Sequence, residues 1–268
     1  MTAPFSKSTP KDAKNTQTAK TAKSPKEITI LQLYPRDMNI YGDTGNLLVL
    51  TRRLEWHGYT PRVIYYNVGD RLPAAKVATK PDIILGGGGQ DSGQIAIHKD
   101  LLAVGDRLRQ WADEGTPMLM VCGLYQLFGH SFKTLDGTFL EGIGILDVKT
   151  IGTTERLIGN IVTHSPDFGN IIGYENHSGQ TYLGKSAQPF ATVVKGAGNN
   201  TSEGHEGARY KHVIGTYLHG SLLPKNPAIA DYLIETAVTN RYGSFDETNI
   251  IDDSFAKAAR EAAQNRPR

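Results

Sequence analysis

Apolar runs of strand length alternate with amphipathic stretches of helix length from Ile28 onward. The runs ITILQLY, PRVIYYNV, DIILGGGG and PMLMV each predict a buried strand, because short continuous apolar runs are typical of strands covered on both faces. Between them, LLVLTRRLEWHG and the stretch from Asp91 to Trp111 carry apolar residues at helical spacing, and we interpret Asp91 and Gln94 as a capping box. This order predicts an α/β fold with a doubly wound, mostly parallel sheet flanked by helices.

The second half of the chain has a different texture. After Gly137 the apolar runs are shorter and are separated by Gly, Asn and Thr, which predicts an antiparallel extension of the same domain. We expect residues 199–207, NNTSEGHEG, to form a surface loop. HVIGTYLHG then predicts a further strand, and PKNPAIADYLIETAVTNRYG predicts a helix with Asn226 as its cap and Pro227 in its first turn.

Composition divides the chain into three parts. Residues 1–26 hold six lysines and one aspartate among Thr, Ala, Ser and Pro, so they cannot bury enough apolar surface to fold and predict a disordered tail. We assign residues 27–250 to one domain and residues 251–268 to a C-terminal helix with little apolar surface, available for docking a partner. Because the tail carries the positive charge, the remainder is mildly acidic, which removes the charge argument for nucleic-acid binding.

The chain has no sequence features of export or of a membrane span. None of its apolar runs approaches the roughly 20 residues needed to cross a bilayer. The first 26 residues lack the apolar core of a secretory signal, and a single cysteine cannot form an internal disulfide. These features predict a cytoplasmic protein without a transmembrane segment.

The lone cysteine, Cys122, is the first candidate for chemistry. A single cysteine is most often a small buried apolar residue, but here the strand MLMV runs directly into it and GLYQLFGH begins a helix at once. This sharp strand-to-helix turn resembles a nucleophile elbow. We expect the helix N-terminus to favour the thiolate and the Gly123 amide to face a developing oxyanion.

A glycine run and a late histidine supply the other candidate groups. LGGGGQD ends the third strand, and its flexible backbone predicts a second oxyanion amide near Gly88. A phosphate-binding turn is the alternative, but the run lacks the Lys-Ser/Thr of a P-loop. Among the eight histidines, His219 ends an apolar strand and is the candidate base, with His177 as its rival. No histidine pair has metal-ligand spacing, so we predict no metal site.

The motifs together resemble a known enzyme family. ILGGGG, VCGLYQ and GTYLHG are similar to the class I glutamine amidotransferases. The flanking strings YPRDMNIYGDTGN, GIGILD, GYENHSG and GTYLHGSLLPKNP narrow the resemblance to the small glutaminase subunits of lipid II isoglutaminyl synthase, the GatD type. This resemblance runs from Ile28 to Asp252, and it implies the amidotransferase fold over that whole stretch.

The resemblance also implies a reaction and a partner. It implies hydrolysis of L-glutamine and transfer of ammonia to a Mur-ligase-like subunit of the MurT type, in a heterodimer at the inner face of the membrane. That partner would use ATP and Mg²⁺ to amidate the D-glutamate of the lipid II stem peptide during peptidoglycan synthesis, so no cofactor is expected in this chain. By position, the resemblance assigns Cys122 as nucleophile, His219 as general base, and Arg156 and Gln126 as glutamine-binding residues.

One position departs from the broader class. Many class I enzymes carry a glutamate two residues after the histidine, where this chain has Ser221, which agrees with a Cys–His dyad in the narrower family. Glu175 is then a candidate for orienting His219. The alternatives are a cobyric acid synthase-like amidotransferase, which normally carries an ATP-binding domain in the same chain, a non-enzymatic module on the same fold, and a Cys–His peptidase.

Overall fold

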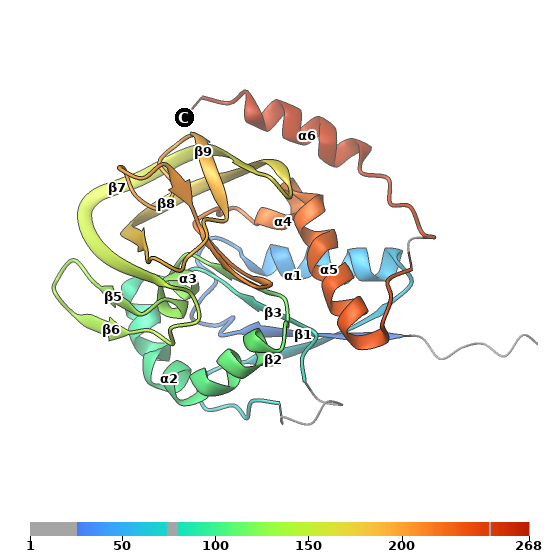
Figure 1. Cartoon of the computed structure of the whole chain (residues 1–268), viewed down its shortest axis with the longest axis horizontal. Coiled ribbons are helices and arrows are strands. Elements are labelled where there is room, and N and C mark those ends of the chain that lie inside the picture. Colours follow the sequence, from blue (N-terminus) through green and yellow to red (C-terminus); the bar gives the residue numbers. More distant parts are fainter. Residues whose placement is uncertain (1–25, 74–79, 247, 268) are drawn as a thin grey trace, which may run out of the picture.

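Two β-sheets with surrounding helices make up the computed structural model, which describes residues 26–73, 80–246 and 248–267 (Figure 1). The first sheet contains β1 (Glu27–Leu33), β2 (Thr60–Tyr66), β3 (Ile83–Gly86), β4 (Met118–Val121), β11 (Ala208–Tyr210) and β12 (Val213–Thr216). The helices are α1 (Thr44–Trp56), α2 (Asp91–Asp113), α3 (Gly123–Phe128), α4 (Leu222–Lys225), α5 (Pro227–Tyr242) and α6 (Ser254–Gln264).

The first sheet has the strand order β11-β12-β4-β3-β1-β2 and is parallel except for the edge strand β11. Every residue of β3, β4 and β12 is buried, which explains their continuous apolar sequences. Helices α1 and α5 lie on one face of the sheet and α2 lies on the other (Figure 1). The prediction of a doubly wound, mostly parallel α/β fold is confirmed.

The strand order also creates a crevice at one edge of the sheet. β1 and β3 are neighbours, but the chain leaves β1 toward α1 and leaves β3 toward α2, on opposite faces. In doubly wound sheets, ligands bind where consecutive connections separate in this way. Cys122 follows β4 and His219 lies three residues after β12, so both segments end at the edge that carries the loops after β1 and β3.

The predicted antiparallel extension forms a sheet of its own. It contains β5 (Ser131–Lys133), β6 (Phe139–Glu141), β7 (Val148–Ser165), β8 (Gly169–Leu183), β9 (Ala191–Lys195) and β10 (His205–Glu206). All of its pairs are antiparallel except β5 with β7. Contacts that join the sheets include the His219 amide, which donates to the Tyr174 carbonyl at 2.8 Å, and the Glu206 carboxylate, which accepts from Thr216 Oγ1 and the Tyr217 amide. These hydrogen bonds hold the second sheet beside the crevice.

The segment 199–207 is not the surface loop that its composition predicted. Only residues 201–204 are exposed, whereas Asn199 and Asn200 are fully buried. Asn199 Oδ1 accepts a hydrogen bond from the Gly207 amide, and Asn200 Nδ2 donates to the Thr181 carbonyl. The prediction was wrong because these amide side chains satisfy buried backbone groups, a role that depends on tertiary contacts.

The predicted helix caps also take other partners. The N-cap of α2 is Gln90, and the Gln94 side chain donates to Gln126 Oε1 at 2.8 Å instead of closing a capping box. α5 begins at Pro227 as predicted, but the Asn226 side chain bonds the backbone of Ile172 on β8. Both polar side chains are thus used to hold separate segments together.

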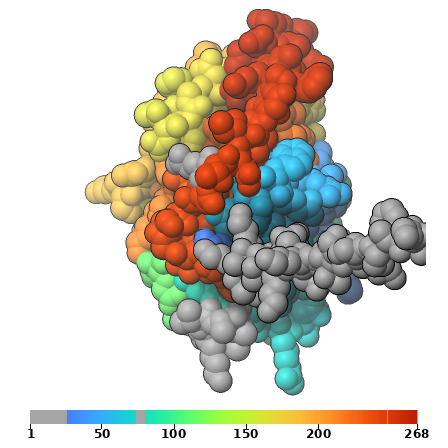
Figure 2. All heavy atoms as spheres, turned by 90° about the vertical axis from the view of Figure 1, so that its right-hand side faces the viewer, coloured from blue at the N-terminus to red at the C-terminus, as the bar shows by residue number. Residues whose placement is uncertain are grey.

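The C-terminal helix α6 has no buried residue and crosses one face of the molecule together with α5 (Figure 2). Arg260 on α6 donates to the Asn170 carbonyl, and Asn160 donates to the Pro267 carbonyl, while Phe255 is 88% exposed. Its role in docking a partner stays a prediction, and so does the division of the chain into three parts.

The predicted tail lies outside the described residues up to residue 25. Within the described ranges, no helix combines the length and apolar character needed to span a bilayer.

Candidate active site

Cys122 occupies the turn between β4 and α3 with φ +49° and ψ −103°, a backbone conformation that non-glycine residues rarely adopt. Its amide donates to the Thr216 carbonyl at 2.8 Å, and its carbonyl accepts from the Gln126 amide. Such strain costs about 1–3 kcal/mol and persists only where surrounding contacts impose it. The predicted elbow is therefore present, and it directs the Cys122 side chain away from the sheet.

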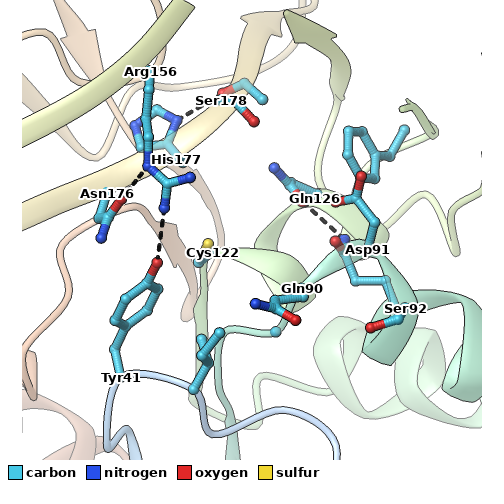
Figure 3. Close-up of a pocket in the computed structure, with 15 residues that line it drawn as sticks. Tyr41, Gln90, Asp91, Ser92, Cys122, Gln126, Arg156, Asn176, His177 and Ser178 are labelled. Carbon is cyan, nitrogen blue, oxygen red and sulfur yellow. Dashed lines mark hydrogen bonds between the residues drawn. The ribbon is translucent and has the colours of Figure 1, made fainter. Parts of the chain in front are cut away.

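A cavity of about 420 Å³ opens in front of this cysteine, within the size range of small-molecule sites. One wall comes from the loops of the first sheet and includes Cys122, Gln126 and Tyr41. The opposite wall comes from the second sheet and includes Arg156 and Asn176 (Figure 3). The cavity therefore lies between the two sheets, at the carboxyl ends of the parallel strands.

His219 lies beside Cys122 behind the glycine loop. A Cβ atom placed on Gly88 would lie 3.0 Å from His219 Cε1 and 3.1 Å from Cys122 Cβ, so the two side chains flank the same point. The imidazole is 1% exposed and packs edge-on against Tyr41, with ring centroids 4.4 Å apart. Neither ring nitrogen has a hydrogen-bond partner among the described residues, which leaves both available for proton transfer.

Burial favours the neutral form of both the Cys122 thiol and the His219 imidazole. Burial raises the pKa of the Cys122 thiol far above its usual range, and the Asp43 carboxylate adds to this rise, while the Gly123 amide and Arg156 oppose it. Burial lowers the pKa of His219 to about 3, and the charges on His177 and Lys225 act in the same direction. The expectation of a resting thiolate was wrong, because desolvation outweighs the helix N-terminus.

The Gly88 amide, predicted to face the oxyanion, already has a hydrogen-bond acceptor in the structure. The Gly88 amide donates to Asp43 Oδ2 at 2.7 Å, and the Gly88 carbonyl accepts from the Ile40 amide at 3.1 Å. The Gly89 nitrogen lies 3.1 Å from the position of a Cβ on Gly123, next to the residue that follows the nucleophile. The Gly89 nitrogen therefore lies close to the residue that follows Cys122, whereas the Gly88 amide already donates to Asp43.

The predicted glutamine-binding residues fall on different parts of the cavity. Arg156 Nε donates to Asn176 Oδ1 at 2.7 Å, and its terminal nitrogen donates to the Tyr41 hydroxyl at 3.3 Å (Figure 3). These bonds hold the guanidinium at the cavity while leaving it exposed to solvent. Gln126 is buried, accepts from Gln94 and donates to the Tyr217 hydroxyl at 3.0 Å, so its side chain is held within the wall.

Two further sequence candidates have other roles. Glu175 accepts hydrogen bonds from the Ala197 and Gly198 amides, and it is not a partner of the His219 nitrogens. The prediction that Glu175 orients His219 was therefore wrong. His177 lines the cavity, but its ring stacks on Tyr217 with centroids 3.6 Å apart and burial lowers its pKa to about 4.

The structure adds three residues that sequence reasoning missed: Tyr41, Asp43 and Gln94. Tyr41 and Asp43 belong to YPRDMNIYGDTGN, a string that carried the family resemblance but in which no residue was assigned a role. Gln94 was interpreted as part of a helix cap. Among the described residues, no three His, Cys, Asp or Glu side chains gather as a metal site.

Comparison with known proteins decides the family. Residues 29–227 match the CobB/CobQ-like glutamine amidotransferase domain family. This chain belongs to that family. The amidotransferase is 38% identical over 235 residues to the Staphylococcus aureus "Lipid II isoglutaminyl synthase (glutamine-hydrolyzing) subunit GatD", and the match covers 87% of this chain and 93% of that protein. It is thus a member of the GatD family of amidotransferase subunits, as the sequence motifs indicated.

Two further matches place the amidotransferase more broadly. It is 30% identical over 184 residues to the cobyric acid synthase of Listeria monocytogenes, covering 65% of this chain and 35% of that protein. A crystal structure of a glutamine amidotransferase matches with a TM-score of 0.52 and 14% identity, covering 77% of this chain and 98% of that chain. The structural match shows that the fold is shared.

Proposed function

We propose that this amidotransferase is the glutaminase subunit of a lipid II isoglutaminyl synthase. It hydrolyses L-glutamine and passes the ammonia to a Mur-ligase-like partner of the MurT type, which amidates the D-glutamate of the lipid II stem peptide. The observation that carries the proposal is the strained Cys122 elbow, with His219 flanking the same point at Gly88. The name and 38% identity of the Staphylococcus aureus relative support the choice of acceptor.

Arg156 binds the substrate's charged end in this proposal. Its guanidinium is exposed on the cavity wall opposite Cys122 and is held by Asn176 and Tyr41. A planar guanidinium can form two parallel hydrogen bonds with the glutamine α-carboxylate. The extended side chain of glutamine would then direct its amide carbon toward the cysteine.

Hydrolysis proceeds through a thioester. The Cys122 sulfur attacks the side-chain amide carbon while His219 takes the thiol proton, and the amides of Gly89 and Gly123 stabilise the oxyanion. When the C–N bond breaks, His219 returns that proton to the leaving group, which departs as ammonia. A water molecule then attacks the thioester, His219 transfers its proton to the departing sulfur, and glutamate is released.

The partner's role follows from the chemistry of ammonia and of the acceptor. Ammonia released into water at neutral pH is mostly protonated and no longer nucleophilic, so the cavity should open toward the ligase in the complex. Activation of the acceptor carboxylate by ATP and Mg²⁺ belongs to the partner. Lipid II precursors are made at the inner face of the membrane, so we place the complex on the cytoplasmic side.

Cobyric acid synthesis is the second candidate, because the chain resembles that enzyme's amidotransferase portion. The identity to the Listeria enzyme is 30% over 184 residues, against 38% over 235 residues to the Staphylococcus aureus GatD subunit. We therefore favour lipid II as the acceptor.

An amidation assay tests the proposal. The chain is purified with a Mur-ligase-like partner and supplied with lipid II, ATP and either glutamine or ammonium chloride, and the product is measured by mass spectrometry. We expect amidation with both nitrogen sources, and Cys122→Ala should lose only the glutamine-dependent reaction. Failure of the wild-type pair to amidate lipid II with glutamine, or full glutamine-dependent activity of Cys122→Ala, would refute the proposal.

A further inference from the structure

A buried carboxyl next to the nucleophile has no part in the steps described so far. Asp43 is 2% exposed and immediately precedes α1, where an aspartate commonly caps the helix with its side chain. Here the side chain makes no capping bond, and Oδ2 accepts instead from the Gly88 amide at 2.7 Å. The carboxyl is thus turned away from its own helix and toward the glycine loop.

The approach of Asp43 to the glycine loop depends on the absence of side chains there. A Cβ on Gly87 would lie 2.3 Å from the Met38 carbonyl oxygen and 2.9 Å from Asp43 Cβ. Neither distance is possible for a real side chain, so this close contact requires glycine. The loop after β1 and the loop after β3 therefore fit together at backbone distance, at the point where the sheet's connections diverge.

Both polar backbone atoms of Gly88 are held by the same short segment. Asp43 accepts from its amide, and the Ile40 amide donates to its carbonyl at 3.1 Å. The Gly88 carbonyl and the Gly89 amide belong to one planar trans peptide unit, so they point in opposite directions. With its carbonyl fixed on Ile40, this unit directs the Gly89 N–H toward the other side, and the Gly89 nitrogen lies 3.1 Å from the position of a Cβ on Gly123.

We propose that Asp43 is a positioning residue that, together with the Ile40 amide, fixes the Gly88 backbone so that the Gly89 N–H faces the oxyanion formed at Cys122. This inference rests on the proposed glutaminase function and adds to it the residue that orients the oxyanion hole. It also explains why the Gly88 amide itself is not a donor to substrate. The Asp43 side chain acts through Gly88 and contacts no reacting atom.

The inference predicts different effects on two reactions of the Cys122 sulfur. Attack on the glutamine amide forms an oxyanion, whereas alkylation by iodoacetamide displaces iodide from carbon without forming one. Loss of the Asp43 acceptor should therefore slow glutamine hydrolysis much more than alkylation. A general collapse of the site would slow both.

The test compares three variants of the full chain, with kcat and KM for glutamine measured beside the iodoacetamide rate at Cys122. Asp43→Ala removes the acceptor, and we expect kcat to fall about 10- to 100-fold, since loss of one oxyanion donor costs about 10²–10³. KM should stay within about threefold of wild type on that view. Alkylation should not become slower, because loss of the Asp43 carboxylate removes a charge that raises the pKa of the Cys122 thiol. Asp43→Asn keeps an oxygen acceptor of the same shape and should restore kcat to within about threefold of wild type.

Asp37→Ala is the matched control, because Asp37 is an exposed aspartate on the same loop, and it should behave as wild type. If Asp43→Ala does not fold, Asp43→Leu keeps the branched shape without the acceptor and replaces it in the comparison. A wild-type kcat in the Asp43→Ala or Asp43→Leu variant would overturn the inference. An equal fall of kcat in Asp43→Asn and Asp43→Ala would also overturn it, as would an alkylation rate that falls as much as kcat.

The two proposals fail in different ways. Glutamine hydrolysis that survives in Cys122→Ala would refute the proposed function, whatever Asp43 does. An inactive Cys122→Ala beside a fully active Asp43→Ala would refute only the positioning role.

Discussion

The two walls of the cavity are built from different sheets, and they differ in how much water they admit. On the first wall, the side of the parallel sheet, Cys122 lines the cavity, and His219 and Asp43 lie behind the lining residues. These three side chains are each no more than 5% exposed, and the pKa of each is displaced by burial. On the wall from the antiparallel sheet, Arg156 is exposed and hydrogen-bonded to its neighbours. The comparison shows that the bond-making groups are kept dry and fixed, while the group for a charged substrate end remains in contact with solvent.

The difference in solvent exposure between the two walls has a physical reason. Dry surroundings strengthen the electrostatic contacts that stabilise an oxyanion, and they need no reorganisation during reaction. A carboxylate entering from water loses less solvation at an exposed guanidinium than at a buried one. Substitutions on the first wall should therefore change kcat, and substitutions on the second wall should change KM.

The largest effect is expected on the first wall, at His219. Replacing it by Asn removes the proton acceptor, and kcat should fall by about 10²–10⁴ because positioned acid–base groups contribute that much. His177→Asn, on the second wall, should cost less than about tenfold, because the ring of His177 packs on Tyr217 and has no part in the proposed mechanism. Steady-state glutamate release measures both. A greater loss in His177→Asn than in His219→Asn would exchange their roles.

A smaller effect is expected on the second wall, at Arg156. Arg156→Ala should raise the KM for glutamine about 10- to 100-fold, with kcat changed less, because a hydrogen bond to a charged group is worth about 1.5–3 kcal/mol. Arg156→Lys should recover only part of this loss, since lysine cannot form the two-pronged bond. Arg52→Ala, at an exposed arginine on α1, is the control. An unchanged KM in Arg156→Ala would remove this residue from the substrate site.

The smallest effect concerns Glu206, which joins the two sheets. Its carboxyl is fully buried, and burial raises its pKa to about 8 from 4.5. The folded state therefore binds a proton that the unfolded state has lost at neutral pH, so stability falls as pH rises toward 8. The buried His177 and His219 act in the opposite direction near pH 6.5, because each is half protonated there in the unfolded state and neutral in the folded state, and this effect fades as pH rises toward 8.

We expect the contribution of Glu206 to the free energy of unfolding to drop by about 1–2 kcal/mol between pH 6.5 and 8, given the limiting slope of about 1.36 kcal/mol per pH unit. Glu206→Gln keeps the oxygen that accepts from Tyr217 and should flatten this dependence. Urea titrations at a series of pH values measure it. Equal slopes for the two proteins would show that Glu206 is ionised in the fold.

The sequence predicted those parts of the site that depend on local structure. The elbow at Cys122 follows from an apolar strand running into a helix, and His219 follows from the end of another strand. The partners of these residues depend on how distant loops meet, which periodicity does not encode. Asp43 reaches the glycine loop across 45 positions of the chain, and Gln94 turns from its own helix end toward Gln126.

The error about the thiolate has a related origin. The sequence indicated a helix N-terminus at Cys122, which favours ionisation, but it could not show that folding would bury the sulfur beside Asp43. Burial costs a charged group more than a short helix returns to it. Local sequence therefore located the turn that carries Cys122 but not the burial that raises the pKa of its thiol.

The central claim is that Cys122 forms a thioester with the glutamyl group of glutamine. Quenching the enzyme with acid during turnover and digesting it for mass spectrometry tests this directly. We predict that the peptide containing Cys122 carries one glutamyl group, that Cys122→Ala carries none, and that hydroxylamine removes the group. Turnover with no glutamyl adduct on any peptide, or with the adduct on another residue, would contradict the account.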